Sequence, residues 1–151
     1  MQSPKWYGAR YPNIDDLKSF AVSQGAVLAY ADIPFSVFLP DVEGVRVIIL
    51  PNGLGLLDEC WSLAHELGHL VKHSGPKGVR SHGKEEAQAN QWAARALIPS
   101  ARIRHHQNAS LDTFIGALSA HYEELPLWDC PQRRLAARIA EIRLGALEDV
   151  A

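Results

Sequence analysis

The stretch Leu63-Ala64-His65-Glu66-Leu67-Gly68-His69-Leu70 lies in a segment whose apolar spacing predicts a helix. A helix places residues four apart on one face, one turn from each other, so the imidazoles of His65 and His69 are expected to lie together. Two imidazoles so placed can bind one Zn²⁺ at ~2.0–2.1 Å each. Glu66 lies beside this pair and can take a proton from a water molecule there. The stretch therefore has the His-Glu-x-x-His pattern of zinc-dependent peptidases.

The ends and faces of this helix can also be predicted. Asp58 is the expected N-cap, and Ser74-Gly75-Pro76 is the expected end. Gly68 would weaken a helix interior by about 1 kcal/mol relative to alanine, so we expect another group to approach the helix backbone closely there. An apolar face is expected to pack on a core while a histidine face lines a cleft. The histidine face comprises Trp61, His65, Glu66, His69 and His73, and the apolar face comprises Leu63, Leu67, Leu70 and Val71. The alternative is an ordinary amphipathic helix whose polar residues face solvent.

A third metal ligand is expected on a second helix, predicted from Lys84 to about Ile98. One stripe of this helix contains Glu86, Asn90, Ala93 and Leu97, while Gln88, Gln91 and Arg95 lie on the opposite, polar side. Glu86 is thus expected on the packed side, where an unpaired carboxylate is costly and a metal ion would remove the cost. The alternative is an ordinary acid near a helix N-terminus, which is how we interpret Glu85.

Both segments together resemble the ImmA/IrrE family of bacterial metallopeptidases. The matching residues run from Leu63 to His73, with Ala-His-Glu-Leu-Gly-His, and from Glu86 to Pro99, with Glu-x-x-Ala-Asn, an aromatic residue, alanine and a final Leu-Ile-Pro. The resemblance implies a minimal zincin-like domain with a gluzincin-like site: His65, His69 and Glu86 on zinc, and Glu66 as base. It also implies a helix-turn-helix transcriptional repressor as substrate. Trp61 matches the aromatic residue that often precedes the motif, but the usual basic residue is missing.

Composition bounds the class of protein. The chain has 151 residues, which predicts one domain over 1–151, and its 47% apolar and 21% charged content is ordinary for a soluble globular protein. A net charge of −2 gives no electrostatic reason to expect direct nucleic-acid binding. We expect no transmembrane helix and no signal peptide. Cys60 and Cys130 are expected to be reduced thiols, which suits the cytoplasm.

The remaining segments predict an α+β fold in which helices pack on a small antiparallel β-sheet. Beyond the two motif helices, the expected helices are 13–23, with Asn13 and Asp16 forming a capping box, 100–106, 113–123 and one from 129 or 131 to 147; the expected strands are 26–31, 35–39 and 45–50. A turn at 41–44 should join the last two strands in a hairpin. Strand 45–50 is expected either to be an exposed edge that binds substrate or to be a core strand.

Other polar residues have several possible roles. His73 is expected near the metal ligands or at the surface, and His82 either folds over the site or is a solvated loop residue. His105-His106 and His121-Tyr122 are candidate donors for an oxyanion, and the sequence does not choose between them. The last helix is basic, through Arg133, Arg134, Arg138 and Arg143, which indicates a solvated face or a surface for an acidic partner or DNA.

The expected function is that of a cytoplasmic zinc endopeptidase acting on a specific protein partner. Two alternatives stay open: a non-catalytic binding module in which zinc joins two helices, and a component of a toxin-antitoxin pair. The substrate, its cleavage site, the activating signal, the oligomeric state and the metal used in the cell do not follow from the sequence.

Overall fold

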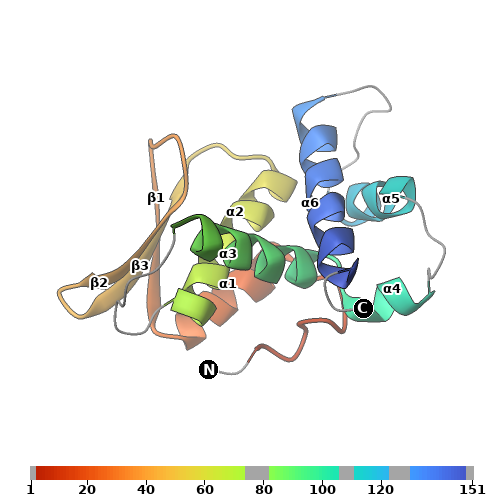
Figure 1. The fold of residues 1–151 in the computed structure, drawn as a ribbon. Coiled ribbons are helices and arrows are strands. Elements are labelled where there is room, and N and C mark those ends of the chain that lie inside the picture. Colours follow the sequence, from red (N-terminus) through yellow and green to blue (C-terminus); the bar gives the residue numbers. More distant parts are fainter. Residues whose placement is uncertain (1–2, 74–81, 106–110, 123–129, 149–151) are drawn as a thin grey trace.

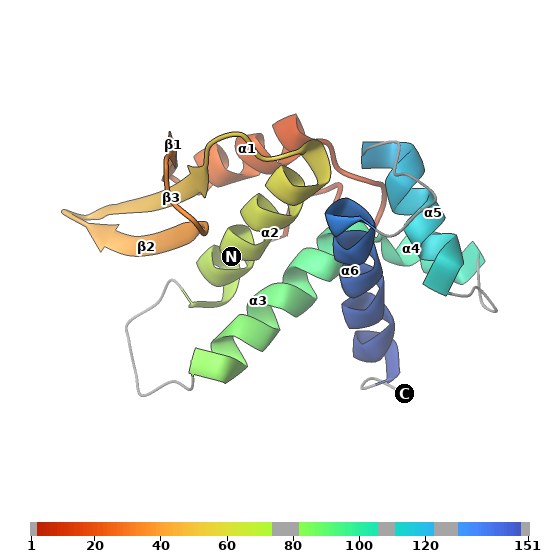
Figure 2. The same cartoon turned by 90° about the horizontal axis from the view of Figure 1, so that it is seen from above.

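The chain folds as an α+β structure in which helices cover one face of a three-stranded sheet. The computed structural model describes residues 3–73, 82–105, 111–122 and 130–148. The elements are α1 (Ile14–Ser23), β1 (Ala26–Ala31), β2 (Val37–Val42), β3 (Val45–Pro51), α2 (Leu56–His73), α3 (His82–Leu97), α4 (Ser100–His105), α5 (Leu111–Tyr122) and α6 (Pro131–Glu148). The sheet and the pair α5–α6 lie at opposite ends of the molecule, with α2 and α3 between them (Figures 1 and 2).

The sheet is mixed, with strand order β1-β3-β2. The β2–β3 pair is antiparallel, with Phe38 opposite Ile48, which confirms the predicted hairpin. However, β1 runs parallel to β3, with Leu28 opposite Ile48, so the expectation of a purely antiparallel sheet was wrong in this pair. After β1 the chain crosses to the other edge of the sheet and forms β2. It then turns back, so that β3 lies between β1 and β2. Of the two alternatives for strand 45–50, the exposed edge was therefore wrong and the core strand is correct: β3 is the central strand and β2 is an edge.

The second strand begins two residues later than predicted and ends three residues later. The pairing of β2 with β3 is irregular between Leu39 and Val42, which accommodates Pro40 on an edge strand. The turn is correspondingly tight, since Glu43 and Gly44 both have positive φ, 54° and 84°. The side chain of Asp41 accepts a hydrogen bond of 2.7 Å from the Gly44 N–H. The turn therefore needs only two central residues, as in two-residue hairpin loops.

The start of α1 agrees with the prediction, whereas the start of α2 does not. Asn13 caps α1 in a capping box: its side chain accepts from the Asp16 N–H at 2.8 Å, and the Asp16 carboxylate accepts from the Asn13 N–H at 2.9 Å. In α2 the first turn forms earlier than expected, because the Glu59 N–H already donates to the Gly55 carbonyl at 2.8 Å. Asp58 therefore lies inside the first turn rather than at the N-cap, where its charge still suits the helix dipole.

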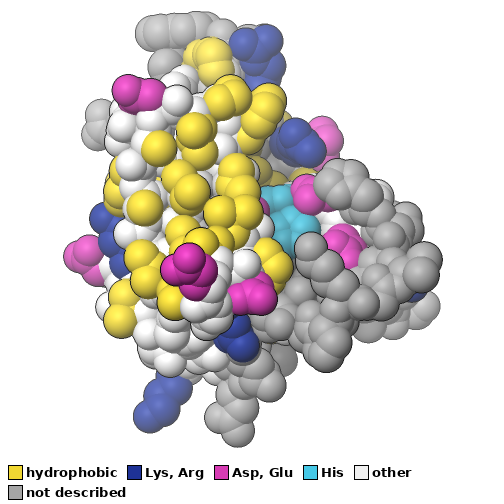
Figure 3. Space-filling view, turned by 90° about the vertical axis from the view of Figure 1, so that its left-hand side faces the viewer, with side chains coloured by type: hydrophobic (Ala, Val, Ile, Leu, Met, Phe, Trp, Pro, Cys, Tyr) yellow, Lys and Arg dark blue, Asp and Glu magenta, His cyan; other side chains and the backbone are white. Residues whose placement is uncertain are grey.

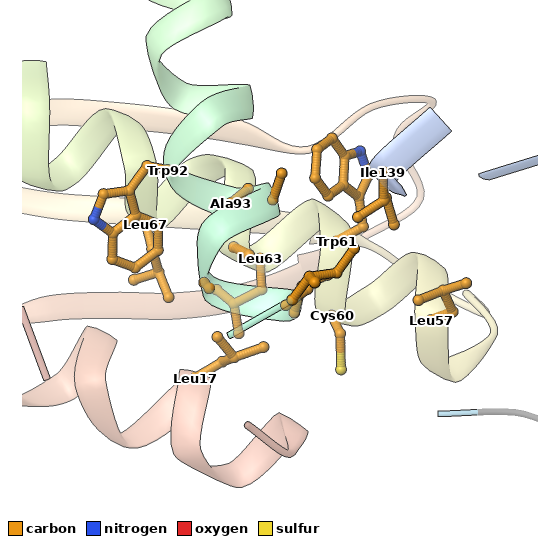
Figure 4. Packing of buried hydrophobic residues seen from close by; sticks show 14 of the residues in the cluster. Leu17, Leu57, Cys60, Trp61, Leu63, Leu67, Trp92, Ala93 and Ile139 are labelled. Atoms are coloured by element: carbon orange, nitrogen blue, oxygen red, sulfur yellow. The ribbon is translucent and has the colours of Figure 1, made fainter. Parts of the chain in front are cut away.

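The core is built around α2, which α1, α3, α5, α6 and the sheet all contact. Figure 4 shows side chains of α2 packed between Leu17 of α1, Trp92 and Ala93 of α3, and Ile139 of α6. Trp61 and Glu66, which were expected on a face lining a cleft, are themselves 9% and 3% exposed. A helix surrounded on several sides is buried around most of its circumference, so the histidine face is more enclosed than a simple amphipathic pattern predicts.

The four arginines predicted to make the last helix basic are not all exposed on α6. Arg143 is 3% exposed and donates to the Ile98 carbonyl at 2.9 Å and to the Ser100 hydroxyl at 3.0 Å. Its guanidinium thus ties α6 to the junction of α3 and α4. Over the described segments, no helix is both long and apolar enough to cross a membrane.

Candidate metal centre

Three side chains from α2 and α3 converge beside the sheet. The Nε2 atoms of His65 and His69 are 3.2 Å apart. The Glu86 carboxylate faces both rings, with Oε2 3.0 Å from His65 Nε2 and Oε1 2.9 Å from His69 Nε2. The two histidine side chains are 16% and 12% exposed. Figure 3 shows histidine side chains at the surface next to the sheet.

These donors suit a zinc ion. Two ligands at ~2.0–2.1 Å from a tetrahedral ion lie about 3.3–3.4 Å apart, close to the 3.2 Å between the two Nε2 atoms. Two imidazoles and one carboxylate are also a ligand set that leaves the fourth zinc position open, as in catalytic sites. A neighbouring carboxylate is within reach as well, because ligand atoms of His65, Glu66 and His69 lie within 4.8 Å of one another. The group can therefore hold a metal ion with one carboxylate to spare.

Asn90 orients His65 through the ring nitrogen that does not face Glu86 and His69. Its Oδ1 lies 2.7 Å from His65 Nδ1. An amide oxygen only accepts, so this contact assigns the ring proton to Nδ1 and leaves the lone pair of Nε2 directed at Glu86 and His69. The sequence placed Asn90 on the same stripe as Glu86 but predicted no role for it. The signal that could have identified Asn90 is its position four residues after Glu86, on the same face of the helix.

Glu66 occupies a different environment from Glu86. It is 3% exposed, and the Ser36 hydroxyl, from the residue just before β2, donates to its Oε2 at 3.0 Å. Burial raises the pKa of the Glu66 carboxyl above its usual range; His65 and the Ser36 hydroxyl act in the opposite direction, and Glu86 adds to the increase. A carboxylate whose proton affinity is raised is suited to accept a proton and return it. Ser36 carried no motif that would have predicted this contact.

Gly68 permits the two helices to meet at the site. A Cβ placed on it would lie 2.7 Å from the Ala89 carbonyl oxygen and 2.9 Å from the Ala89 Cα. The expected close approach to the backbone at Gly68 is therefore confirmed, and the approaching group is the backbone of α3. Because Ala89 precedes Asn90, the contact at Gly68 sets how near the polar stripe of α3 comes to His65 and His69.

The structure corrects the predicted surroundings of Glu86. Glu86 has a 39% exposed side chain, so it is not on a fully packed surface. The buried residues of α3 begin at Ala89 and continue to Leu97, whereas residues 83–88 are exposed or half-buried. Support for Glu86 as a ligand thus comes from its two short distances to histidine and not from the cost of burying its charge.

The candidate oxyanion donors of α5 have another role. Tyr122 donates to the Pro12 carbonyl at 2.8 Å, and His121 Nε2 lies 3.2 Å from the same oxygen, so both join α5 to the segment before α1. His106 lies outside the described residues, as do the side chains of His73, His82 and His105.

Comparison with known proteins agrees with this geometry. The family model for the IrrE N-terminal-like domain, peptidase family M78, matches residues 23–124. That match spans β1 to α5 and includes all four residues of the candidate centre. The chain belongs to this peptidase family, which confirms the resemblance drawn from the two helix motifs. No match was found among curated proteins, and none was found among solved structures.

Proposed function

We propose that this protein is a zinc-dependent endopeptidase with His65, His69 and Glu86 as metal ligands and Glu66 as general base. The observation that carries the proposal is the convergence of three ligand side chains from two helices, with a second, buried carboxylate beside them. The closest distances, 2.9–3.2 Å, are of the size that neighbouring ligands on one ion require. Membership of a peptidase family supports the same reading.

Each residue of the candidate centre has a different proposed role in hydrolysis. Zinc, when bound, supplies a Lewis acid that polarises the scissile carbonyl and lowers the pKa of water. Glu66 takes the proton from the attacking water and delivers it to the leaving amine. The Ser36 hydroxyl holds the Glu66 carboxylate in place through Oε2, and Asn90 holds the imidazole of His65 in the tautomer that binds metal.

The surface beside the site is suited to a protein substrate. The edge strand β2 follows directly after Ser36, so a substrate segment paired with its free edge would pass close to Glu66. Hydrophobic side chains cover the neighbouring face of the sheet in Figure 3, and the exposed ones include Phe35 at 75% and Val37 at 37%. Exposed apolar patches of this kind commonly bind other proteins. We propose a helix-turn-helix repressor as the partner, from the family resemblance, and the cytoplasm as the compartment, from the free thiols of Cys60 and Cys130.

The decisive experiment is Glu66→Gln. This change keeps the size and the hydrogen-bond acceptor for Ser36 but removes the base, so we expect zinc content to stay near one per chain while cleavage falls by at least a hundredfold. Zinc content is measured by metal analysis, and cleavage is measured with a candidate helix-turn-helix repressor as substrate. Glu85→Gln, on the first turn of α3, is the matched control and should leave both unchanged.

The same pair of variants separates the enzyme from a binding module. A module that only titrates its partner would bind the repressor equally well as wild type and as Glu66→Gln, with no cleavage in either case. Unchanged cleavage by Glu66→Gln would reject Glu66 as the base.

A further inference from the structure

A second polar site lies on the opposite side of α3 from the candidate metal centre. It is a hollow with a volume of about 220 Å³, formed where the last turn of α2 meets α3 and the N-terminal segment. Its lining residues are Tyr7, Lys72, Gln88, Gln91, Trp92 and Arg95. Gln88, Gln91 and Arg95 form the polar side of α3 that the sequence analysis set apart from Glu86 and Asn90. The proposed peptidase chemistry uses none of them.

The two charged side chains that line this hollow are both positive. Lys72 and Arg95 line it, and neither forms an ion pair with a carboxylate in the described segments. Arg143 is close enough to Arg95 and Tyr7 to interact electrostatically with both, and it is buried with only neutral hydrogen-bond partners, Ile98 and Ser100. The chain as a whole has a net charge of −2, so this local excess of positive charge does not reflect the overall composition. Arg143 is buried, Arg95 is half-buried and Lys72 is exposed, and a buried cation normally has an anion nearby.

A buried donor at the same place also lacks an acceptor. Trp92 is 4% exposed, and within the described part of the chain its indole Nε1 is a buried polar atom without a hydrogen-bond partner. In Figure 4 this nitrogen lies on the side of the ring away from Ala93 and Leu63. The ring is stacked on Tyr7, with 4.9 Å between centroids, and the Tyr7 hydroxyl donates to the Trp92 carbonyl at 3.4 Å. Such unsatisfied buried donors are rare in folded proteins.

The chemistry of the lining specifies what the partner must be. Ammonium and guanidinium groups only donate hydrogen bonds, and glutamine amides can donate as well. A ligand that satisfies them must be rich in acceptors and negatively charged. We propose that this hollow binds an oxyanion, a phosphate or a carboxylate group, between Lys72 of α2 and Arg95 of α3. The bound anion joins the two helices whose contact at Gly68 forms the candidate metal centre.

Calorimetric titration of the full-length, metal-free protein tests the site without any assay of peptidase activity. Sodium phosphate and sodium acetate are the probes, each compared with sodium chloride at equal ionic strength. We expect saturable binding of one phosphate or one acetate per chain and no binding of chloride. Tighter binding of phosphate would identify a phosphate site, and tighter binding of acetate would identify a carboxylate site. Equal responses to all three salts would overturn the proposal.

Variants locate the binding. Arg95→Gln should weaken the affinity for the preferred anion at least tenfold, whereas Arg138→Gln, which removes the same charge from an exposed position on α6, should leave it unchanged. Lys72→Gln provides a second test on α2 should Arg95→Gln fail to fold. Equal weakening by Arg95→Gln and Arg138→Gln would show a general charge effect and overturn the site.

A further variant replaces a neutral lining residue of the hollow by a negatively charged one. Gln91→Glu places a carboxylate in the hollow without a change of size, so it should raise the melting temperature in low salt and abolish binding of the added anion. A lower melting temperature together with unchanged anion binding would contradict the assignment.

Discussion

At the scale of single residues, the environment of each carboxylate distinguishes two glutamates that the sequence could separate only by position. Glu86 faces two imidazole nitrogens at 2.9 and 3.0 Å, whereas Glu66 is buried and accepts a hydrogen bond from Ser36. The first arrangement suits a ligand, and the second suits a base that must exchange a proton. The same comparison applies to histidine: His65 has a defined partner on Nδ1, and His121 contacts the backbone at Pro12 instead of the site.

The contact between Asn90 and His65 leads to a prediction about metal affinity. Asn90→Ala removes the acceptor for His65 Nδ1–H, so the imidazole loses its orientation and we expect zinc to bind about 10–100-fold more weakly. Asn90→Asp should restore most of the affinity, because a carboxylate oxygen accepts the same hydrogen bond. Zinc affinity is measured by competition with a chelator, with the fold checked by circular dichroism. Equal loss in both variants would argue against this orienting role.

At the scale of helices, the approach of α3 to α2 depends on one glycine. Gly68→Ala would place a methyl group 2.7 Å from the Ala89 carbonyl oxygen, so α3 must move away from α2. We expect a loss of stability of about 1–3 kcal/mol, as for overpacked cores, although alanine favours helix formation. Zinc affinity should fall with it, because Glu86 and Asn90 move with α3.

Another helical glycine provides the control. A Cβ on Gly116 of α5 would contact nothing within 4 Å. Gly116→Ala should therefore stabilise the protein by up to about 1 kcal/mol, as measured by urea denaturation. If both alanine variants were equally stable, the close approach at Gly68 would not be a packing constraint.

The start of α1 predicts a dependence of stability on pH. The hydrogen bond from Arg10, at 2.6 Å, is the main reason that the pKa of the Asp16 carboxyl lies below its usual range, and the Asn13 N–H contributes to the shift. Because the pKa is lower in the folded state, the stabilisation is complete above the ordinary aspartate pKa of about 4 and is lost as pH falls through the lower, folded value.

Urea midpoints of wild type and Asp16→Asn measure this effect. Wild type should be more stable at pH 7, and the difference should shrink as pH falls from about 4 towards 2.5. Asp15→Asn, which removes an exposed acid from the same turn, is the matched control for the loss of one charge. A constant difference between wild type and Asp16→Asn would rule out this linkage.

At the scale of the whole molecule, α2 is both the centre of the core and the source of two proposed metal ligands, so metal binding and global stability should be linked. At a thousandfold excess over its dissociation constant, zinc would stabilise the native state by about 4 kcal/mol. For a chain of this size that corresponds to roughly 8–16 °C in melting temperature. Scanning calorimetry of the zinc-loaded and chelated protein measures the difference.

The double variant His65→Ala, His69→Ala tests whether this effect belongs to the proposed site. It should melt at nearly the same temperature with and without zinc. Identical melting of the chelated and loaded wild-type protein would mean that zinc binds weakly, and a persistent shift in the double variant would mean that it binds elsewhere.

The sequence by itself determined the family, the α+β class and the residues of the candidate metal centre. Each of these depends on local spacing: His65 and His69 four apart on a helix, Glu86 followed by Asn90, and the capping box at Asn13. Such patterns can be recognised in the sequence because a helix brings together residues three and four apart, whatever surrounds the helix.

Only the tertiary structure decided which strand lies at the edge of the sheet, which side chain supports Glu66 and how exposed Glu86 is. Strand order follows from how the chain crosses from β1 to β2, and Ser36 meets Glu66 across thirty positions of sequence. The partner of Gly68 and the positive hollow at Lys72 and Arg95 likewise arise where α2 and α3 meet. Contacts between distant segments depend on packing, which no local periodicity records.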